Sequence, residues 1–217
     1  SRGETMRFNS SGTLDTAKLE FAVKAKGEAL DLGILGRVAV FPDYEVKAGK
    51  ANFDLTVSSS PKGTYLPVKI LGKFNLQNGA ARIGPVEVRD FNASLDGKKD
   101  RLAINEIAAD VSGNVIKLSG EIAAGGENKL ALQAEAPVLK LETLAQIVPA
   151  LSSISLAGKG RARADISGSL RNPKVTGTLD LFAGRLLKGY FNKFSAQADL
   201  ADNILNVAAK GTDFFGG

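Results

Sequence analysis

Few residues of this chain could do chemistry, and most of those are carboxylates. The sequence contains no histidine and no cysteine, which removes thiol nucleophiles, the common zinc ligand sets and every triad that uses imidazole as a base. Close carboxylate pairs do occur, Asp96 with Asp100 and Asp199 with Asp202. Both pairs lie in turn-like sequence, where Asp is favoured because its side chain caps the backbone. The sequence therefore predicts a protein that is not an enzyme, with no cofactor and no metal.

Two segments begin like ligand-binding loops but lack residues that the chemistry needs. The stretch 96–107, DGKKDRLAINEI, starts like a calcium loop, yet Lys98 and Ile107 stand at positions that require oxygen ligands. The stretch 158–165, GKGRARAD, has two of the three glycines of a dinucleotide fingerprint and then continues in strand-like alternation. Neither segment predicts an ion or phosphate site.

The net charge is +5, with 28 Lys and Arg against 23 Asp and Glu. Basic residues cluster at 98–101 and again at 159–163. Proteins that bind single-stranded nucleic acid combine such groups with exposed aromatic residues. Here Trp is absent, and Phe53 and Phe74 lie on the apolar side of their alternation. A nucleic-acid-binding β domain is therefore the least favoured of the functional alternatives. We expect any acidic partner to bind through positive charge that is spread over the surface rather than at a defined site.

Most of the chain alternates between apolar and polar residues, as strands with one buried face do. Between residues 18 and 57 the strand-like runs are KLEFAVKAKG, EALDLGILG, RVAVFPD and ANFDLTVSSS. Later runs are each closed by Gly, Asn or Asp, as in an antiparallel meander. The polar loop SSSPKGTY at 58–65 divides an N-terminal β-strand module, residues 1–60, from a β-repeat region, residues 61–217.

One segment departs from this alternation. LETLAQIVPALSS places four apolar residues at the spacing of one helical face, namely Leu144, Ile147, Val148 and Leu151. Because Pro149 kinks or ends a helix, the pattern predicts one short helix at about residues 142–151. A single helix of this length is far too small to cover a sheet of many strands.

The chain also repeats itself. The stretch ILGKFNLQNGAARI at 70–83 aligns with VTGTLDLFAGRLLK at 175–188. Three matched pairs share a separation of 105 residues: Gly72 with Gly177, Leu76 with Leu181 and Gly79 with Gly184. Phe91 then matches Phe194 at a separation of 103 residues. Internal repeats of this kind are typical of elongated arrays in which neighbouring units complete each other's core.

Together, the alternating runs predict one continuous apolar face, with Lys, Asp and Asn making the opposite face wet. The residues expected on the apolar face are Leu19, Phe21, Val23, Phe53, Leu55, Val57, Phe74, Leu76, Ala93, Leu95, Ile116, Leu118, Leu130, Leu132, Leu179 and Leu181. An acyl chain on such a face gains about 0.8 kcal/mol per buried methylene, so binding requires no specific residue. A closed β-sandwich or barrel, in which the same residues pack against each other, is the alternative that the pattern leaves open.

The segment ISGSLRNPKVTGTLDLFAGRL, preceded by PVLKLETLAQIVPALSSISLAGKGRARAD, carries the pattern G-x-L-x-N-P-x-V-x-G-x-L. Its positions are Gly168, Leu170, Asn172, Pro173, Val175, Gly177 and Leu179. A short helix, a Gly-rich strand and an Asn-Pro turn between two strands resemble the C-terminal repeats of the AsmA-like and TamB-like family of Gram-negative envelope proteins. The resemblance extends from about residue 85 to the end, while the first 60 residues share only the alternating style.

The resemblance implies an all-β fold in which an elongated antiparallel sheet curls into an open, taco-like groove with an apolar inner face. It also implies a periplasmic location, inner-membrane anchoring through regions outside this chain, possible envelope protein partners, and phospholipid movement between the inner and outer membranes. The opening SRGETMRF lacks an initiator methionine, so we expect a fragment or a processed form. A structural envelope scaffold or adhesin-like β-repeat protein is the second functional alternative.

Overall fold

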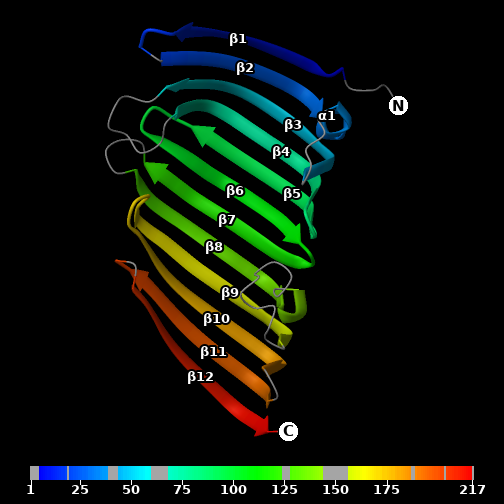
Figure 1. Cartoon of the computed structure of the whole chain (residues 1–217), viewed down its shortest axis with the longest axis vertical. Helices are drawn as coiled ribbons and strands as arrows, with labels where there is room; N and C mark the ends of the chain where they lie inside the picture. Colours follow the sequence, from blue (N-terminus) through cyan, green and yellow to red (C-terminus); the bar gives the residue numbers. More distant parts are fainter. Residues whose placement is uncertain are drawn as a thin grey trace.

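The computed structural model contains a single antiparallel β-sheet (Figure 1). It describes residues 5–18, 20–38, 44–59, 68–123, 128–143, 156–186, 189–202 and 204–216. Twelve strands follow one another in the sheet in chain order, each paired with its neighbours in sequence. The elements are β1 (Arg7–Asp15), β2 (Glu20–Asp31), α1 (Leu32–Val38), β3 (Tyr44–Ser59), β4 (Val68–Ile83), β5 (Val86–Gly97), β6 (Arg101–Val111), β7 (Asn114–Ala123), β8 (Lys129–Lys140), β9 (Leu156–Ser169), β10 (Pro173–Leu186), β11 (Gly189–Ala201) and β12 (Ile204–Gly216).

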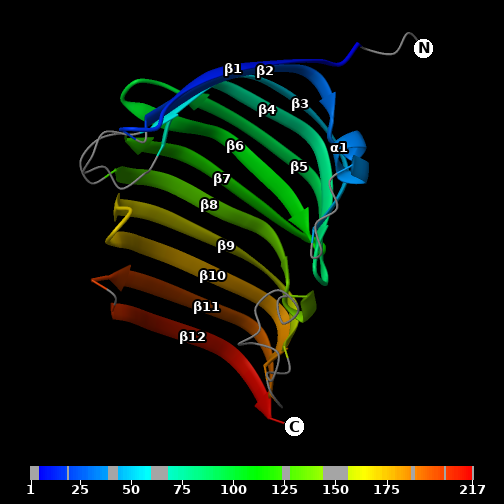
Figure 2. The same cartoon turned by 45° about the horizontal axis from the view of Figure 1, so that its top comes forward.

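The sheet is neither closed nor strongly curled, and Figure 2 shows the strands bending gently along their length. Among the described strands, β1 pairs only with β2 and β12 only with β11. The closed sandwich or barrel is therefore wrong, and of the predicted taco-like groove the structure shows the open antiparallel sheet without a strong curl. The chain exposes 14140 Å² of surface to solvent. A compact protein of this mass would expose about 9,500 Å², so the exposed surface is larger by roughly one half. A single layer of strands explains the excess, because one sheet cannot bury both of its faces.

The all-β prediction and the antiparallel meander are confirmed. The predicted Asn-Pro corner lies between β9 and β10, with Pro173 as the first residue of β10, a position that Pro tolerates because its missing N–H costs little there. The Ser169 hydroxyl accepts a hydrogen bond from the Asn172 N–H at 3.1 Å. The Asn172 side-chain amide donates to the Asp202 carboxylate at 2.7 Å, which ties this corner to the turn after β11.

The prediction of one helix is wrong, because the described residues contain two very short ones. Residues 32–38 form α1, where the runs EALDLGILG and RVAVFPD predict strands. The Asp31 carboxylate accepts a hydrogen bond from the Gly33 N–H at 2.8 Å, which caps the start of α1. Residues 141–143 are also helical, and the rest of the helix predicted at 142–151 lies outside the described residues. Alternation over so few residues does not distinguish a strand from one helical turn.

Bulges give the repeated segments their local shape. Asn78 in β4 has φ 51° and Ala183 in β10 has φ 44°, and these two residues are separated by the repeat distance of 105. Each lies beside a shift in the pairing register, where a bulge bends the strand and increases its twist. The freed Asn78 N–H donates to the Asn92 side chain on β5 at 3.1 Å. The repeat in the sequence therefore encodes a repeated bulge.

The register also corrects one match within the repeat. In the first copy Gly79 faces Phe91 across the ladder, and in the second copy Gly184 faces Phe191. Phe191, rather than the predicted Phe194, is thus the structural counterpart of Phe91. The register around each bulge, which the sequence alignment does not contain, sets this equivalence.

Candidate functional site

Two unbroken rows of apolar residues cross the sheet from strand to strand. Residues directly opposite each other on paired strands point to the same face, so each row marks one face of the whole sheet. The first row crosses all twelve strands through Phe8, Gly27, Phe53, Phe74, Leu95, Ile104, Gly120, Leu132, Ile166, Val175, Leu200 and Leu205. The second row crosses β2 to β12 through Leu30, Ala51, Leu76, Ala93, Ile107, Leu118, Ala134, Ala164, Gly177, Ala198 and Val207. Neither row contains a polar side chain, and we call this side of the sheet the apolar face.

All but one of the residues that the sequence predicts on the apolar face lie on it. The remaining residue, Leu19, lies outside the described residues. Seven belong to the two rows, namely Phe53, Phe74, Leu95, Leu132, Leu76, Ala93 and Leu118. The others point the same way because they lie an even number of residues along the same strands, namely Phe21, Val23, Leu55, Val57, Ile116, Leu130, Leu179 and Leu181. Whether these side chains contact a lipid stays a prediction.

Sequence reasoning missed several members of the apolar face. Ile104 and Ile107 in β6 both belong to it, although they are three residues apart. A register shift between them lets both side chains reach the same face, and an alternation of period two cannot include both. Ile166, in contrast, obeys simple alternation with its neighbours and could have been found from the sequence.

Two small buried clusters lie on the apolar face. The N-terminal cluster consists of Leu30, Ala51, Leu76 and Ala93, with Leu32 of α1 packed against it. The C-terminal cluster consists of Leu141, Leu181 and Phe191, with Leu179 and Phe194 packed against it. Leu76 and Leu181, which the repeat pairs, are 6% and 7% exposed. The repeat therefore places one buried leucine in each of the two clusters.

A polar contact holds the short helical turn at 141–143 against the C-terminal part of the sheet. Asn114 is fully buried, and its side-chain oxygen accepts a hydrogen bond from the Lys140 N–H at 2.7 Å. Its side-chain amide donates to the Thr143 hydroxyl at 2.6 Å and to the Val111 carbonyl at 3.2 Å. All of the polar atoms of this buried amide are used, so the contact fixes where the chain leaves β8.

The opposite face of the sheet, which we call the wet face, carries charged residues that lie opposite each other on neighbouring strands. Lys73 lies between Asp54 and Asp96 in the register of β3, β4 and β5. The Asp180 carboxylate accepts a hydrogen bond from the Ser195 hydroxyl at 2.8 Å and one from the Arg161 guanidinium at 3.1 Å. These two hydrogen bonds lower the pKa of Asp180, with the larger contribution from Ser195. Lys73 and Asp180 therefore lie on the wet face, as the alternation predicts.

Four basic residues of the two clusters predicted from the sequence form ion pairs with neighbouring carboxylates. The nitrogen–oxygen distances are 3.7 Å for Lys98–Asp96, 3.7 Å for Arg101–Glu121, 3.1 Å for Arg161–Asp180 and 3.8 Å for Arg163–Glu135. Each of these exposed pairs contributes at most about 1 kcal/mol to stability. The positive charge is accordingly spread over many strands in small balanced groups.

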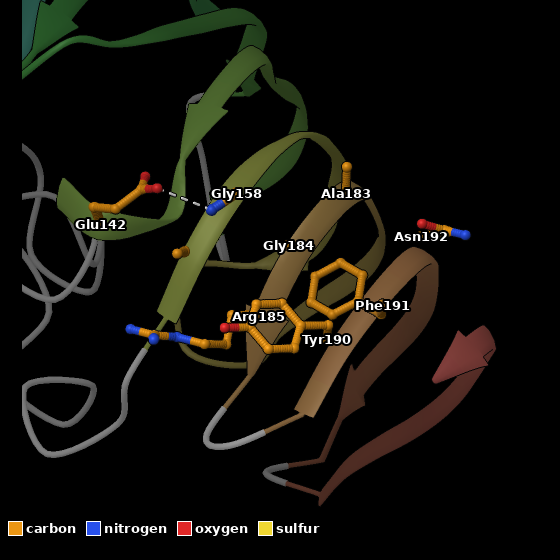
Figure 3. Close-up of a pocket in the computed structure, with 9 residues that line it drawn as sticks. Glu142, Gly158, Ala183, Gly184, Arg185, Tyr190, Phe191 and Asn192 are labelled. Atoms are coloured by element: carbon orange, nitrogen blue, oxygen red, sulfur yellow. Dashed lines mark hydrogen bonds between the residues drawn. The ribbon is translucent and has the colours of Figure 1, made fainter. Parts of the chain in front are cut away.

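One shallow depression, of about 570 Å³, lies beside the C-terminal cluster (Figure 3). Figure 3 shows the Tyr190 and Phe191 rings near Arg185, with Glu142 on the far side. The Glu142 carboxylate accepts a hydrogen bond from the Gly158 N–H at 3.0 Å. Hydrogen bonds from the backbone N–H groups of Glu142 itself and of Gly158 lower the pKa of this carboxyl. The carboxylate thus acts as a cap for the irregular start of β9.

Within the described ranges, no three His, Cys, Asp or Glu side chains are grouped closely enough to hold a metal ion. No helix in the described part of the chain is long and apolar enough to span a membrane. In comparisons with known proteins, no family model, no curated protein and no solved structure matched this chain. The functional argument therefore depends on the apolar face itself.

Proposed function

We propose that this chain is a non-enzymatic lipid-carrying segment that holds phospholipid acyl chains on the apolar face of its sheet. The observation that carries the proposal is the pair of apolar rows that cross the sheet without one polar side chain. No second layer of described strands covers these rows. Acyl chains are suitable ligands for these rows because they require only a continuous apolar surface of sufficient length.

The energetics favour such a cargo. Burying one methylene contributes about 0.8 kcal/mol, so an acyl chain of about 16 carbons gains on the order of 10 kcal/mol before the costs of ordering. The rows run across the strands, so the long axis of the face follows the strand order from β1 to β12. A chain can shift along this direction from one strand to the next without breaking a specific contact. That property suits transport better than storage at one site.

In this proposal the gentle bend of the sheet deepens into the open, taco-like groove that the family resemblance implies. The bulges at Ala29, Asn78 and Ala183 supply the local bending, and lipid on the inner side would favour further closure. The same resemblance supports a periplasmic setting and movement of phospholipid between inner and outer membranes. Envelope protein partners and an inner-membrane anchor outside this chain belong to the proposal in the same way.

Photo-crosslinking tests the proposal directly. Crosslinking residues would be placed on the apolar face at Leu95, Leu132 and Leu179, which are half-buried, and on the wet face at Lys73 and Asp180 as controls. After gentle purification, extraction and lipid mass spectrometry, we expect phospholipid bound to the protein and crosslinks from the apolar positions alone. Absence of lipid, or equal crosslinking from both faces, would reject lipid carriage and favour a structural scaffold or adhesin.

A charged substitution separates carriage from folding. Leu179 lies opposite Ala162 and Ala196, two small residues that leave the site half open. We expect Leu179→Asp to stay folded, because its carboxylate keeps access to water, while bound lipid falls to background. Thr178→Asp, on the wet face of the same strand, is the matched control and should keep its lipid. Unfolding of Leu179→Asp would indicate that this part of the face is a dry core.

A further inference from the structure

The short helical turn at residues 141–143 is the structural counterpart of α1. Three pairs of residues in and beside these two helical segments share a separation of 109 residues, namely Leu30 with Leu139, Leu32 with Leu141 and Gly49 with Gly158. A Cβ atom at Gly49 would lie 3.1 Å from the Cα atom of Gly79, and one at Gly158 would lie 2.9 Å from the Cα atom of Gly184. The sheet therefore has two equivalent corners, each made of a short helical segment, a close-packed glycine and a bulge.

The two corners differ in what lies over the close-packed glycine. At the first corner the Cδ1 atoms of Leu76 and Leu32 lie 3.2 Å and 3.3 Å from the position of a Cβ atom at Gly49. At the second corner the three atoms nearest to the same position at Gly158 are all backbone atoms. The second corner therefore lacks leucine side chains this close to the glycine, and the depression of about 570 Å³ lies there.

The depression adjoins the apolar face. Its lining comes from the turn after β8 and from β9, β10 and β11. One of the lining residues, Phe191, is 3% exposed and belongs to the C-terminal cluster, against which Leu179 packs. The volume lies within the range of about 300–1,000 Å³ that is usual for small-molecule sites. A ligand in the depression can therefore extend an apolar part onto the apolar face.

One side of the depression carries donors for an anion. Arg185 and Tyr190 face each other in the register of β10 and β11, so their side chains lie next to each other. Both are exposed, and Figure 3 shows the Tyr190 hydroxyl beside the Arg185 side chain. A guanidinium presents several N–H donors and a phenol adds one O–H donor. This combination suits the oxygens of a phosphate.

The other side of the depression carries an acceptor for a cation. The Glu142 carboxylate accepts one hydrogen bond from the Gly158 N–H at 3.0 Å, and a carboxylate has sites for further donors. Hydrogen bonds from backbone N–H groups, and more weakly the charges of Lys159 and Lys140, lower its pKa. The group therefore stays ionised at neutral pH and can accept hydrogen bonds from an ammonium group.

We propose that this depression binds the headgroup of a phospholipid that carries both a phosphate and a primary ammonium, as phosphatidylethanolamine does. Arg185 and Tyr190 hold the phosphate, Glu142 holds the ammonium, and the acyl chains run past Phe191 onto the apolar face. The inference rests on the proposed lipid-carrying function and names the class of lipid that is carried.

Other headgroups fit the two sides less well. A headgroup that is only anionic, as in phosphatidylglycerol, places no positive group beside the Glu142 carboxylate. A quaternary ammonium, as in phosphatidylcholine, has no N–H to donate to that carboxylate. The preference should therefore depend on Glu142, whereas Arg185 should contribute to the binding of all three lipids.

The test measures which lipid the full chain takes up. The protein is freed of co-purified lipid and incubated with vesicles that contain phosphatidylethanolamine, phosphatidylglycerol and phosphatidylcholine in equal amounts with identical acyl chains. After re-isolation, mass spectrometry should find phosphatidylethanolamine enriched about fivefold over each of the others, as expected for one exposed charge pair. Glu142→Gln should abolish this preference, and Arg185→Gln should lower the bound amount of all three lipids about fivefold.

Two control variants remove the same charges elsewhere. Arg163→Gln and Glu135→Gln each remove one member of an exposed ion pair outside the depression and should leave the bound lipids unchanged. Equal uptake of the three lipids, or a preference that survives in Glu142→Gln, would overturn the headgroup site and leave lipid carriage standing. Binding of glycerophosphoethanolamine as tight as that of the lipid would mean that the site takes the free headgroup, which would also overturn it. Uptake of no lipid at all would overturn both proposals.

Discussion

The two copies of the internal repeat, in β4–β5 and β10–β11, share a bulge after a buried Leu but differ in the side chains around it. Each copy has a buried Leu, Leu76 or Leu181, followed by a residue of positive φ and then a glycine that faces a phenylalanine. The neighbours differ. Beside the first copy, β3 contributes Phe53 and Leu55 to the apolar face, whereas beside the second copy β9 contributes Ala162 and Ala164.

This difference divides the apolar face into two regions. In the N-terminal region Phe53 and Phe74 stack with their ring centroids 6.3 Å apart, so the face is largely filled by its own side chains. In the C-terminal region small residues leave the backbone of the sheet closer to the surface, namely Ala134, Ala162, Ala164, Gly177, Ala196 and Ala198. The apolar face therefore has a self-filling region beside the first copy and a recessed region beside the second.

The largest effect is expected at one glycine of the repeat and not at its counterpart. Gly72 has φ +108° and a side chain there would meet the Asp54 carbonyl, whereas a side chain at Gly177 would meet nothing nearer than 3.5 Å. Gly72→Ala should lower the free energy of unfolding by about 2 kcal/mol, and Gly177→Ala should change it by less than about 0.5 kcal/mol. Urea unfolding measures both. Equal losses would show that the two copies share the same backbone at this position.

A smaller loss is expected from the buried amide that secures the C-terminal region. Asn114→Ala leaves the Lys140 N–H and the Thr143 hydroxyl without this partner. The free energy of unfolding should fall by about 1 kcal/mol, because the Thr143 hydroxyl keeps its hydrogen bond to the Lys140 carbonyl. Asn9→Ala, at an exposed position of β1, is the matched control and should have little effect. If thermal denaturation finds no difference between the two variants, Asn114 does not hold the turn at 141–143.

The recessed region should tolerate bulk that the self-filling region does not. Ala164 is half-buried among Ala134 and Gly177, so Ala164→Phe should fold normally and lower bound lipid several-fold by filling the recess. Ala93 is buried in the N-terminal cluster, so Ala93→Phe should instead cost about 1–3 kcal/mol of stability through overpacking. Lipid mass spectrometry and urea unfolding distinguish these outcomes. A destabilised Ala164→Phe variant would remove the distinction between the regions.

The smallest expected effect is a pH dependence that belongs to the C-terminal region. The pKa of Glu142 is lower in the folded chain than its ordinary value of 4.5, because backbone N–H groups donate to the carboxylate. This stabilisation is present above the unfolded pKa and is lost as the pH falls through the lowered folded pKa. Since the carboxylate is exposed, the contribution is well under about 1 kcal/mol.

Replacing the carboxylate with an amide isolates this contribution. Glu142→Gln keeps an acceptor for the Gly158 N–H but does not titrate. The loss of stability between about pH 6 and about pH 3 should therefore be slightly smaller in Glu142→Gln than in the wild-type chain. Urea midpoints at several pH values measure the difference. Identical pH profiles would mean that Glu142 does not cap the start of β9.

Much of the apolar face could be predicted because alternation is a local property. In β10 the apolar side chains of Val175, Leu179 and Leu181 follow a period of two, and the pairing places all three on one face. Prediction failed where the register changes. A bulge inserts one residue into one strand only, so Ile104 and Ile107 share a face that no fixed period assigns to both. The helix α1 was missed because its seven residues leave too short a pattern.

Within each strand that has no bulge, the sequence by itself determined which residues face the same way, and it determined where the repeat places its buried leucines. Only the tertiary structure decided that the sheet stays open. A closed sandwich and an open sheet require the same alternation of apolar and polar residues, because in either fold each strand has one apolar side. The two folds differ in which strands pair at the edges and in what lies against the apolar face. Those contacts join residues far apart in the chain, and no local pattern specifies them.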